Sequence, residues 1–393
     1  MHPRFPIGHE EKRTALLAAV ERVRETVTSH ADEAEAMATL PPATVDALIT
    51  SGLLTLKLPT VLGGAEADPV TQIEVIEALS AMEPSAGWCT MIGATGIGLP
   101  AAFVAEEAIT QIFAGGHIPT AAIVAMPTGQ ATPMDGGYRV SGRWSFVSGV
   151  RHAQWITAGV RVVRAGDVPA EQRMMVFPVT DAHLHDNWHV AGLQGTGSCD
   201  VSLTECFVPD AFTWEPLHAQ PQRGGPLYRL GLPGFVANEH AAFALGVGRC
   251  ALETVMALAQ SKRRGFTSSP SHLEARSVFQ RAVGVCDLRL RAARALVLGI
   301  FAEAWTTLCA GEIPPPRLQA EMRSVAAFAT EVAVDVTTQA FRYAGGTAVY
   351  RTQRLQRCLR DIQVAAQHLI VSDIAYETHG QFALGLPDAD PMR

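Results

Sequence analysis

Paired cysteine motifs are missing from this sequence. Seven cysteines are scattered over 393 residues, their number is odd, and no Cys-x-x-Cys spacing occurs. This pattern is untypical of a disulfide framework or a zinc site. We therefore expect no bound metal and a reducing environment, which favours the cytoplasm. The cysteines are Cys89, Cys199, Cys206, Cys250, Cys286, Cys309 and Cys358.

An excess of positive charge is also missing. The chain has 31 Lys and Arg against 38 Asp and Glu, a formal net charge of −7. A general nucleic-acid binder needs a basic face that displaces counterions, so the composition argues against this class of protein. The first residues lack a basic start followed by a long apolar core, and we expect no signal peptide.

One uncharged stretch, Pro84 to Ala105, is long enough to be considered as a membrane helix. Serine, threonine, several glycines and Pro100 dilute its apolar character. A buried helix or helix pair is the better interpretation, and we expect no membrane partner.

The motifs of several other enzyme classes are absent or out of context. No nucleophile elbow Gly-x-Ser-x-Gly occurs, which disfavours a hydrolase. Gly192-x-x-Gly195-x-Gly197 is followed by a strand-like run, so it does not predict a dinucleotide loop. His183, His185 and His189 lack a set of chelating carboxylates, and a metal there is disfavoured.

Three kinds of pattern follow one another along the chain. Residues from about 10 to 115 have apolar residues at helical spacing. From about 117 to 215, short alternating runs separated by Gly, Pro and Asp predict an antiparallel β unit. From about 235 the pattern is helical again, with breaks at Pro314–Pro316 and Gly345–Gly346. We predict domains at 1–116 (helical), 117–218 (β) and 219–393 (helical). One predicted apolar stripe consists of Leu288, Ala292, Ala295, Leu296 and Gly299.

Six segments in a fixed order resemble the acyl-CoA dehydrogenase superfamily over nearly the whole chain. They are residues 51–64, 137–149, 192–201, 207–209, 345–346 and 360–361. The resemblance implies a mainly α fold with a central antiparallel β domain: a helical domain, a β-barrel and a C-terminal four-helix bundle.

A narrower resemblance rests on Ser148-Gly149-x-x-His152-Ala-x-Trp155 and on His368. Many dehydrogenases of the superfamily have a glutamate after the Arg-Asp pair, whereas here Ala-Ala-Gln-His368 follows Arg360-Asp361. The chain is similar to the two-component (group D) flavin-dependent monooxygenases, such as seco-steroid phenol hydroxylases and 4-hydroxyphenylacetate hydroxylase. This implies hydroxylation of an aromatic or polycyclic small molecule by reduced FMN or FAD and O2, through a C4a-hydroperoxyflavin.

The resemblance also implies a set of site residues. His368 acts as base or hydrogen-bond partner of a phenol, and Ser148 steadies the flavin adduct. The implied cofactor-binding residues are Met126, Thr128, Trp144, Ser145, Phe146, Ser148, Arg263, Gln280, Gly345 and Gly346.

Each of these assignments has a structural alternative. Trp144 and Phe146 are alternatively sheet core residues, Gly346 a helix cap, and His368 a core histidine. Arg264 is as available as Arg263. Phe103, Trp88 and Trp155 either shape an aromatic pocket or pack in the core.

No nicotinamide-binding fingerprint is evident, which implies a separate NAD(P)H-flavin reductase. Relatives of this kind usually form homotetramers, and the late apolar stripes offer such an interface. An acyl-CoA dehydrogenase or a nitroalkane-type oxidase is an alternative that needs a carboxylate base, for which Glu239 and Asp361 are available. An amino-sugar N-oxygenase of the nitrososynthase type and a catalytically silent flavin-fold scaffold are further alternatives.

Overall fold

The computed structural model describes residues 4–164, 171–264 and 271–392, and they form two compact units. Unit 1 contains the residues up to Ala67, Trp88–His189 and Gln194–Arg229. Unit 2 contains Asp68–Gly87, Val190–Leu193 and the residues from Leu230 onward. The three-domain division predicted from the sequence stays a prediction.

The helices of unit 1 lie within the part of the chain predicted to be helical, residues 10 to 115 approximately. Helix α3 (Pro42–Ser51) has a proline in its first turn and ends at Gly52, where a φ of 83° favours glycine because it lacks a β-carbon. Two short 3₁₀ turns follow, at Leu53–Thr55 and Thr60–Leu62. The helices are α1 (His9–Ser29), α2 (Ala31–Met37), α3 (Pro42–Ser51), α5 (Pro84–Phe103, of which residues 88–103 belong to unit 1) and α6 (Glu106–Ile112).

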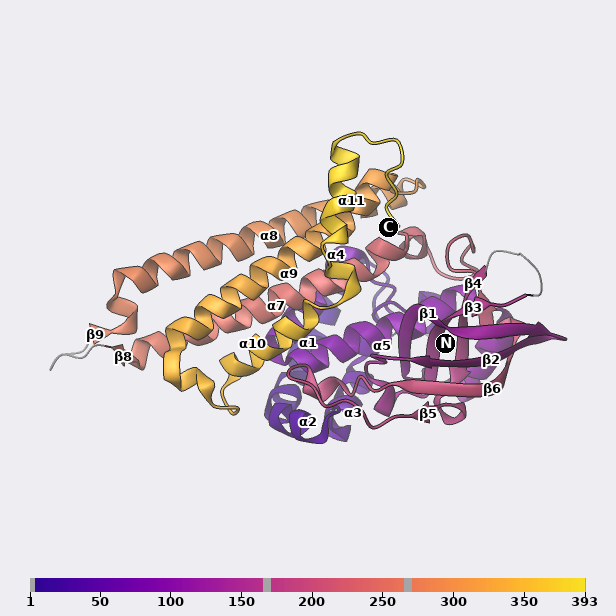
Figure 1. Cartoon of the computed structure of the whole chain (residues 1–393), viewed down its shortest axis with the longest axis horizontal. Helices are drawn as coiled ribbons and strands as arrows, with labels where there is room; N and C mark the ends of the chain where they lie inside the picture. The colour runs from indigo at the N-terminus through magenta and orange to yellow at the C-terminus, as the bar shows by residue number, and fades with distance from the viewer. Residues whose placement is uncertain (1–3, 165–170, 265–270, 393) are drawn as a thin grey trace. The chain divides into compact units, whose positions relative to one another are not determined.

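A seven-stranded sheet forms the middle of unit 1 (Figure 1). Its order is β5-β6-β2-β1-β3-β4-β7. The strands are β1 (Ala121–Met134), β2 (Gly137–Trp144), β3 (Trp155–Val162), β4 (Glu171–Pro178), β5 (His183–Leu184), β6 (Val201–Pro209) and β7 (Thr213–Trp214). One side of the sheet packs against α5, where the Thr157 hydroxyl donates to the Gly96 carbonyl at 3.2 Å.

The sheet differs from the predicted antiparallel unit in one pairing. Five neighbouring pairs are antiparallel, but β1 and β3 run parallel. The cause is the connection between β2 and β3, which includes a 3₁₀ turn at Val150–His152 and carries the chain to the other side of β1. The prediction of purely antiparallel strands was therefore wrong at this pair.

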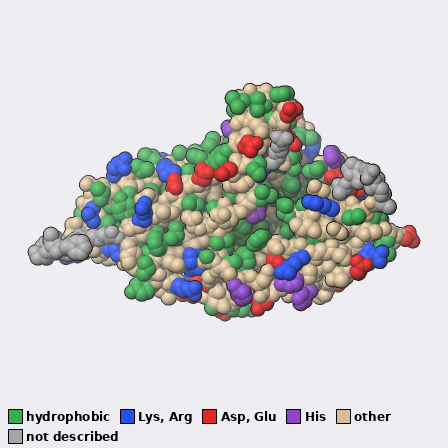
Figure 2. Space-filling view, in the orientation of Figure 1, with side chains coloured by type: hydrophobic (Ala, Val, Ile, Leu, Met, Phe, Trp, Pro, Cys, Tyr) green, Lys and Arg blue, Asp and Glu red, His purple; other side chains and the backbone are tan. Residues whose placement is uncertain are grey.

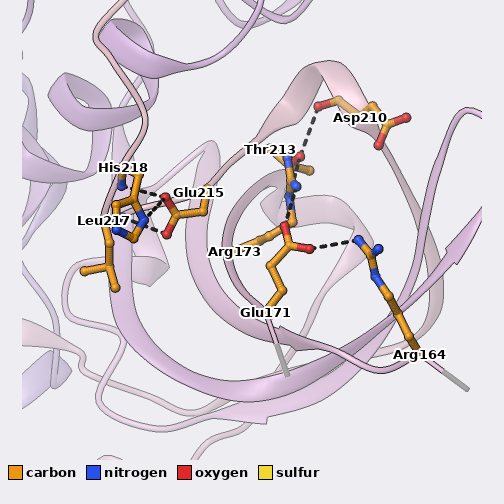
Figure 3. Close-up of polar contacts among 8 residues, drawn as sticks. All are labelled: Arg164, Glu171, Arg173, Asp210, Thr213, Glu215, Leu217 and His218. Carbon is orange, nitrogen blue, oxygen red and sulfur yellow. Dashed lines mark hydrogen bonds and ion pairs between the residues drawn. The ribbon is translucent and has the colours of Figure 1, made fainter. Parts of the chain in front are cut away.

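A polar network joins β4 to β7 (Figure 3). The Glu171 carboxylate accepts from Arg164 at 2.8 Å and from Arg173 at 2.7 Å. Arg173 also donates to the Thr213 hydroxyl at 3.2 Å, and its guanidinium lies 5.4 Å from the centre of the Tyr138 ring. These contacts hold the end of the sheet together.

Unit 2 is a bundle of long helices, in which α7, α8 and α9 lie side by side (Figure 1). Pro316 begins α9, and Gly345 ends it with a φ of 55°. The helices are α4 (Pro69–Met82), α7 (Leu232–Ser261), α8 (Ser277–Cys309), α9 (Pro316–Ala344), α10 (Arg354–Ala365) and α11 (Ile374–Ala383), with a short hairpin of β8 (Arg263–Arg264) and β9 (Ser271–His272). The helical bundle predicted for the C-terminal part of the chain is present.

Helix α8 has two apolar faces. Its buried face recurs at helical spacing through Leu290, Ala293 and Val297. The stripe predicted from the sequence is its other face, and there Leu288 is 62% exposed and Leu296 also contacts solvent. Figure 2 shows hydrophobic side chains at the surface of one face of the molecule, with Lys and Arg side chains among them.

By length and composition, three helices in the described part of the chain are apolar enough to cross a membrane: α5, α7 and α8. Most of the apolar window is buried inside the folded chain in α5 (83%) and α7 (67%), but only 28% of it in α8. The core thus accounts for the apolar character of α5 and α7, but not for that of α8.

Candidate active site

Ser148 is the centre of a buried chain of polar side chains in unit 1. The indole nitrogen Nε1 of Trp88 donates to Ser148 Oγ at 2.9 Å. Ser148 Oγ lies 2.7 Å from Ser198 Oγ, which lies 2.6 Å from Thr196 Oγ1. Indole is only a donor, so Ser148 must accept from Trp88. When Ser198 also donates to Ser148, the Ser148 hydroxyl proton is free to reach a ligand.

The backbone around Met126 and Thr128 is shaped by a wide bulge in β1. Val124 is paired with Ala158 and Gly129 with Val160, so the four residues 125–128 lie opposite Gly159 alone. A β-carbon on Gly159 would lie 2.2 Å from the Ala125 carbonyl oxygen, so only glycine permits this approach. The Met126 side chain is 52% exposed, and the Thr128 hydroxyl donates to the Arg143 carbonyl at 2.9 Å.

The side chains of Trp144 and Phe146 differ in their exposure to solvent. Trp144 is fully buried, and its Nε1 donates to the Gly159 carbonyl at 2.7 Å. Its indole therefore belongs to the sheet core, which leaves only its backbone for contact with a cofactor. Phe146 is 73% exposed, and its φ of 65° is rare for a residue with a β-carbon. Ser145, also exposed, and Phe146 lie after the end of β2 rather than on it, as does Ser148.

His152, four residues after Ser148, contributes a buried imidazole. Burial lowers the pKa of His152 to about 4, so the ring is neutral at pH 7. Its Nδ1 is buried and has no hydrogen-bond partner among the described residues. Gly149 has a φ of 74°, and a β-carbon there would lie 3.0 Å from His152 Nε2. The ring therefore lies against the backbone of the Ser148 loop.

His368 lies in unit 2, in a tight turn directly after α10. The turn continues as a 3₁₀ segment at Leu369–Val371, and Arg323 of α9 donates to the carbonyl oxygens of Leu369 at 3.1 Å and Ile370 at 3.3 Å. A buried guanidinium with two carbonyl partners holds a turn firmly, because leaving it unpaired is costly. These bonds fix the backbone of the turn that begins at His368.

The protonation state of His368 follows from its surroundings. Part of the side chain is accessible to solvent, but protein surrounds most of the ring, and burial lowers the pKa of His368 to about 4. The Ile370 N–H donates to Nδ1 at 3.3 Å. A neutral imidazole with an accepting Nδ1 has its proton on Nε2. At pH 7 His368 is therefore a neutral Nε2–H donor.

Sequence reasoning missed a second histidine at this place. The His240 ring of α7 lies 4.2 Å from the His368 ring between centroids, at an interplanar angle of 36°. His240 Nδ1 lies 2.9 Å from the Val236 carbonyl oxygen, which can only accept. The proton of neutral His240 is therefore on Nδ1. The one sequence signal beside His240 is the adjacent Glu239, a carboxylate available as a base.

The Arg360-Asp361 pair has a structural role. The Leu193 N–H donates to the Asp361 carboxylate at 2.6 Å, and Arg360 donates to the Ala191 carbonyl at 3.0 Å. A β-carbon on Gly192 would lie 2.2 Å from the Arg360 carbonyl oxygen. The segment 190–193 and α10 therefore fit together only with glycine at this position. Asp361 is buried and bonded to backbone, as is expected of a residue that fixes a loop.

The remaining predicted cofactor residues are brought together at one end of the unit 2 bundle. Arg263 of β8 donates to His272 Nε2 at 3.2 Å, and Gln280 near the start of α8 donates to the Glu274 carbonyl at 3.0 Å. Gly345 is the C-cap of α9, and a β-carbon on Gly346 would meet open space. A hydrogen bond from Lys262 to Thr347 ties the end of α7 to the turn after α9. The Arg264 side chain lies outside the described residues.

The three aromatic residues considered for a pocket pack against other side chains. Phe103 stacks on Trp214 with centroids 6.0 Å apart, and Trp155 stacks on Phe212 at 5.9 Å. Trp88 is buried and bonded to Ser148. Among the described residues no three His, Cys, Asp or Glu side chains gather as a metal site would require.

The bulge and the Ser148 loop fit the isoalloxazine ring of a flavin. Residues 125–128 lie outside the regular pairing with β3, and exposed apolar side chains accompany them at Met126 and Phe146. A flat ring system with one polar edge needs such a combination of main-chain groups and apolar surface. The neutral donors of unit 2 are suited to a developing negative charge on oxygen.

Comparisons with known proteins agree with this arrangement. The family "Acyl-CoA dehydrogenase, N-terminal domain" matches residues 9–117, and "Acyl-CoA dehydrogenase, C-terminal domain" matches residues 239–373. A "Pigment production hydroxylase" of Rhodococcus sp. is 30% identical over 388 residues, 97% of this chain and 99% of that protein. An "Indole-3-acetate monooxygenase" of Pseudomonas putida is 30% identical over 347 residues, 87% and 86% of the two chains.

Two further proteins are informative about the cofactor. The "Flavin-dependent monooxygenase, oxygenase subunit HsaA" of Mycobacterium tuberculosis is 26% identical over 96% of this chain and 97% of its own length. The structure of "XiaF from Streptomyces sp. in complex with FADH2 and Glycerol" has a TM-score of 0.89 at 25% identity and covers 98% of both chains. The chain described here belongs to the acyl-CoA dehydrogenase family and, within that family, to the flavin-dependent monooxygenases.

Proposed function

We propose that this protein is the oxygenase component of a two-component monooxygenase. It uses reduced FMN or FAD and O2 to hydroxylate an aromatic or polycyclic small molecule, and a separate NAD(P)H-flavin reductase supplies the reduced flavin. The observation that carries the proposal is the neutral His368, held by the Ile370 N–H, in a chain whose relatives are named as an indole-3-acetate monooxygenase and the oxygenase subunit of a flavin-dependent monooxygenase.

The unit 1 residues are proposed to hold the flavin. The main chain of residues 125–128 and the exposed Phe146 side chain would hold the ring system. Reduced flavin, when bound, supplies the activation of dioxygen. Ser148, which accepts from Trp88, offers its own proton to an oxygen near the ring. The buried surroundings of this hydroxyl exclude water, which protects reactive oxygen species from loss.

The unit 2 histidine is proposed to act on the substrate. A phenol has a pKa of about 10, roughly 6 units above that of His368, so transfer of the phenolic proton to this ring is unfavourable by about 8 kcal/mol. A donor role is the better one. The Nε2–H of His368 donates to the phenolic oxygen and stabilises the negative charge that activates the ring carbon.

The alternative of an acyl-CoA dehydrogenase or nitroalkane-type oxidase, which needs a carboxylate base, has less support. Asp361 is buried and accepts the Leu193 N–H, so its position suits a structural role rather than α-proton abstraction. Glu239 is also buried in α7. The amino-sugar alternative differs in substrate rather than in architecture, and the assay below distinguishes it.

The exposed stripe of α8 supports a homotetramer. Leu288 and Leu296 expose apolar surface along a helix whose other face is already buried in the bundle. Such a face is stabilised when a second copy covers it. Light scattering should give a tetramer for the natural chain and a smaller species for the double variant Leu288→Glu/Leu296→Glu. Arg291→Glu, a charge change on the same helix, should leave the mass unchanged. The cytoplasm stays our proposed location, because the cysteines are unpaired.

The proposal is tested with chemically reduced flavin and ¹⁸O2 in the absence of any reductase. We expect one ¹⁸O atom in the product from a panel of phenols and indoles, and no turnover with NADH and oxidised flavin alone. Labelled product from an amino sugar alone would move the assignment to N-oxygenation. Anaerobic bleaching of bound flavin by an acyl-CoA would show that the protein is a dehydrogenase. FMN and FAD are compared by fluorescence titration of the reduced flavins under argon.

A further inference from the structure

Two cysteines that the proposed reaction does not use meet in the core of unit 2. Cys250 lies on α7 and Cys358 on α10, and both are buried. Their Sγ atoms are 3.4 Å apart, with the Cys358 thiol donating to the Cys250 sulfur. Both are free thiols in this structure. The two sulfur atoms are in van der Waals contact, whereas the S–S bond of a disulfide is about 2.05 Å long.

We propose that Cys250 and Cys358 form a redox modification site, in which hydrogen peroxide converts the two thiols to an intramolecular disulfide. Closing the sulfur–sulfur distance requires a movement of about 1.4 Å, which small side-chain rotations and a slight shift of α10 toward α7 supply. The bond would join the helix that carries His240 to the helix that leads into the His368 turn.

The surroundings favour Cys250 as the attacking sulfur. The hydrogen bond from Cys358 lowers the pKa of Cys250 to about 7, burial opposes this, and the Arg354 guanidinium lowers the pKa further. Arg354 is itself held by the carbonyl oxygens of Ala81 and Met82, so its charge is fixed beside the thiol pair. The bond to Cys250, burial and the Asp361 carboxylate raise the pKa of Cys358, which stays a thiol. A thiolate beside a thiol is the arrangement that reacts with peroxide and then resolves.

The reaction balances without any other reagent. The Cys250 thiolate attacks one peroxide oxygen, the O–O bond breaks, and a sulfenic acid and hydroxide form. The Cys358 sulfur then attacks the Cys250 sulfur and displaces hydroxide, while its own proton is taken up to give water. In sum, two thiols and one hydrogen peroxide give one disulfide and two water molecules. A dithiol reductant reverses the change by thiol–disulfide exchange.

The test uses the full-length protein, reduced, freed of reductant, treated with hydrogen peroxide and then alkylated under denaturing conditions. Trypsin cuts after Arg249, Lys262, Arg357 and Arg360, so the disulfide would join peptide 250–262 to the tripeptide 358–360. We expect this linked peptide in non-reducing mass spectrometry, and its loss after dithiothreitol. Cys309, which is exposed, serves as an internal measure that peroxide acted on the sample.

Two variants separate the pair from ordinary thiol oxidation. In Cys358→Ala the hydrogen bond that lowers the pKa of Cys250 is lost, so oxidation of Cys250 should be slower, but any sulfenic acid that forms has no resolving partner. The linked peptide should be lost, and dimedone should label Cys250 in this variant and not in the natural chain. Cys286→Ala, which removes a buried cysteine of α8, should leave the linked peptide unchanged. The proposal is overturned if Cys250 and Cys358 both remain fully alkylated at peroxide concentrations that oxidise Cys309. It is also overturned if Cys250 is oxidised to sulfinic acid without cross-linking.

Discussion

The imidazole rings of His240 and His368 are in contact, with centroids 4.2 Å apart and a tilt of 36° between their planes. The first is on α7 and the second follows α10, and each ring has one nitrogen fixed by backbone, through Val236 in the first case and Ile370 in the second. If both rings were protonated, their like charges would repel at this short distance. The pair therefore favours a neutral His368, which is the state that the proposed reaction needs.

Replacement of His368 should show whether this residue acts as a hydrogen-bond donor or as a base. We expect His368→Ala to lower product formation by about 10²–10³-fold while flavin binding is kept. His368→Gln, whose side-chain amide retains an N–H donor but has no basic nitrogen, should recover part of this loss. Single-turnover product yield with reduced flavin and O2 measures both. Equal activity of the Gln and Ala variants would contradict the donor role.

Removal of His240 should change the pH dependence of the reaction. His240→Ala opens space beside His368 and admits water, so the pKa of His368 should rise from about 4 toward its ordinary value. Because the neutral ring is active, the acidic limb of the kcat/KM profile should move up by roughly 1–2 pH units. Activity near pH 8 should change little. His240→Phe, which keeps an aromatic ring in place, is the control and should retain the natural limb.

Acidification should destabilise both units. Burial lowers the pKa of His152 and of His368 to about 4, so the unfolded chain binds more protons than the folded chain between about pH 4 and 6.5. The stabilisation is complete above pH 6.5 and is lost as the pH falls toward 4, roughly 3 kcal/mol per ring. Urea unfolding at pH 7 and pH 5 measures the effect.

The matched variants for this experiment are His152→Phe and His117→Phe. The first removes a buried imidazole and should flatten the pH dependence, and the second replaces an exposed one and should not. An unchanged slope in His152→Phe would show that this ring does not resist protonation in the folded protein.

Ser148→Ala should uncouple the reaction. The variant removes the acceptor of the buried Trp88 N–H, which costs about 1–3 kcal/mol of folding free energy, and it removes a proton donor near the proposed flavin position. We expect less hydroxylated product and more hydrogen peroxide per reduced flavin. Ser198→Ala keeps the Trp88–Ser148 bond and should lie between the natural chain and Ser148→Ala. The ratio of peroxide to product is the measurement.

Trp144 and Phe146 should respond to substitution in opposite ways. Trp144→Phe leaves the Gly159 carbonyl unpaired in the core and should cost about 1–3 kcal/mol of stability, with little effect on flavin affinity. Phe146→Gly relieves an unfavourable φ and should stabilise the chain by up to about 1 kcal/mol. It should also weaken binding of reduced flavin by roughly 10-fold, because apolar surface is lost. If flavin binding were weakened by Trp144→Phe and not by Phe146→Gly, the side chain that contacts the flavin would be Trp144 and not Phe146.

Much of the fold could be predicted from local patterns. Helix α3 begins at a proline and ends at a glycine, and the breaks at Pro314–Pro316 and Gly345 separate the late helices as expected. The apolar stripe through Leu288 was also found from spacing, but spacing cannot tell which of two apolar faces a bundle buries. The parallel pairing of β1 and β3 could not be predicted, because the residue pattern of a strand does not show in which direction its neighbour runs.

The candidate site could be predicted only in part. The order of motifs pointed to Ser148 and His368, because residue type and spacing are properties of the chain. The bulge opposite Gly159, the left-handed Phe146 and the burial of the Trp144 indole follow from how strands and loops pack, and no local pattern specifies them.

The sequence by itself determined the family, the order of helical and β segments, and the presence of a histidine where related dehydrogenases have a carboxylate. The tertiary structure decided what that histidine can do. Burial sets its charge, the Ile370 N–H sets its tautomer, and His240 reaches it from a distant helix. It also brought Cys250 and Cys358 into contact. Charge, tautomer and contact depend on which groups surround an atom in space, and the chain order does not contain that information.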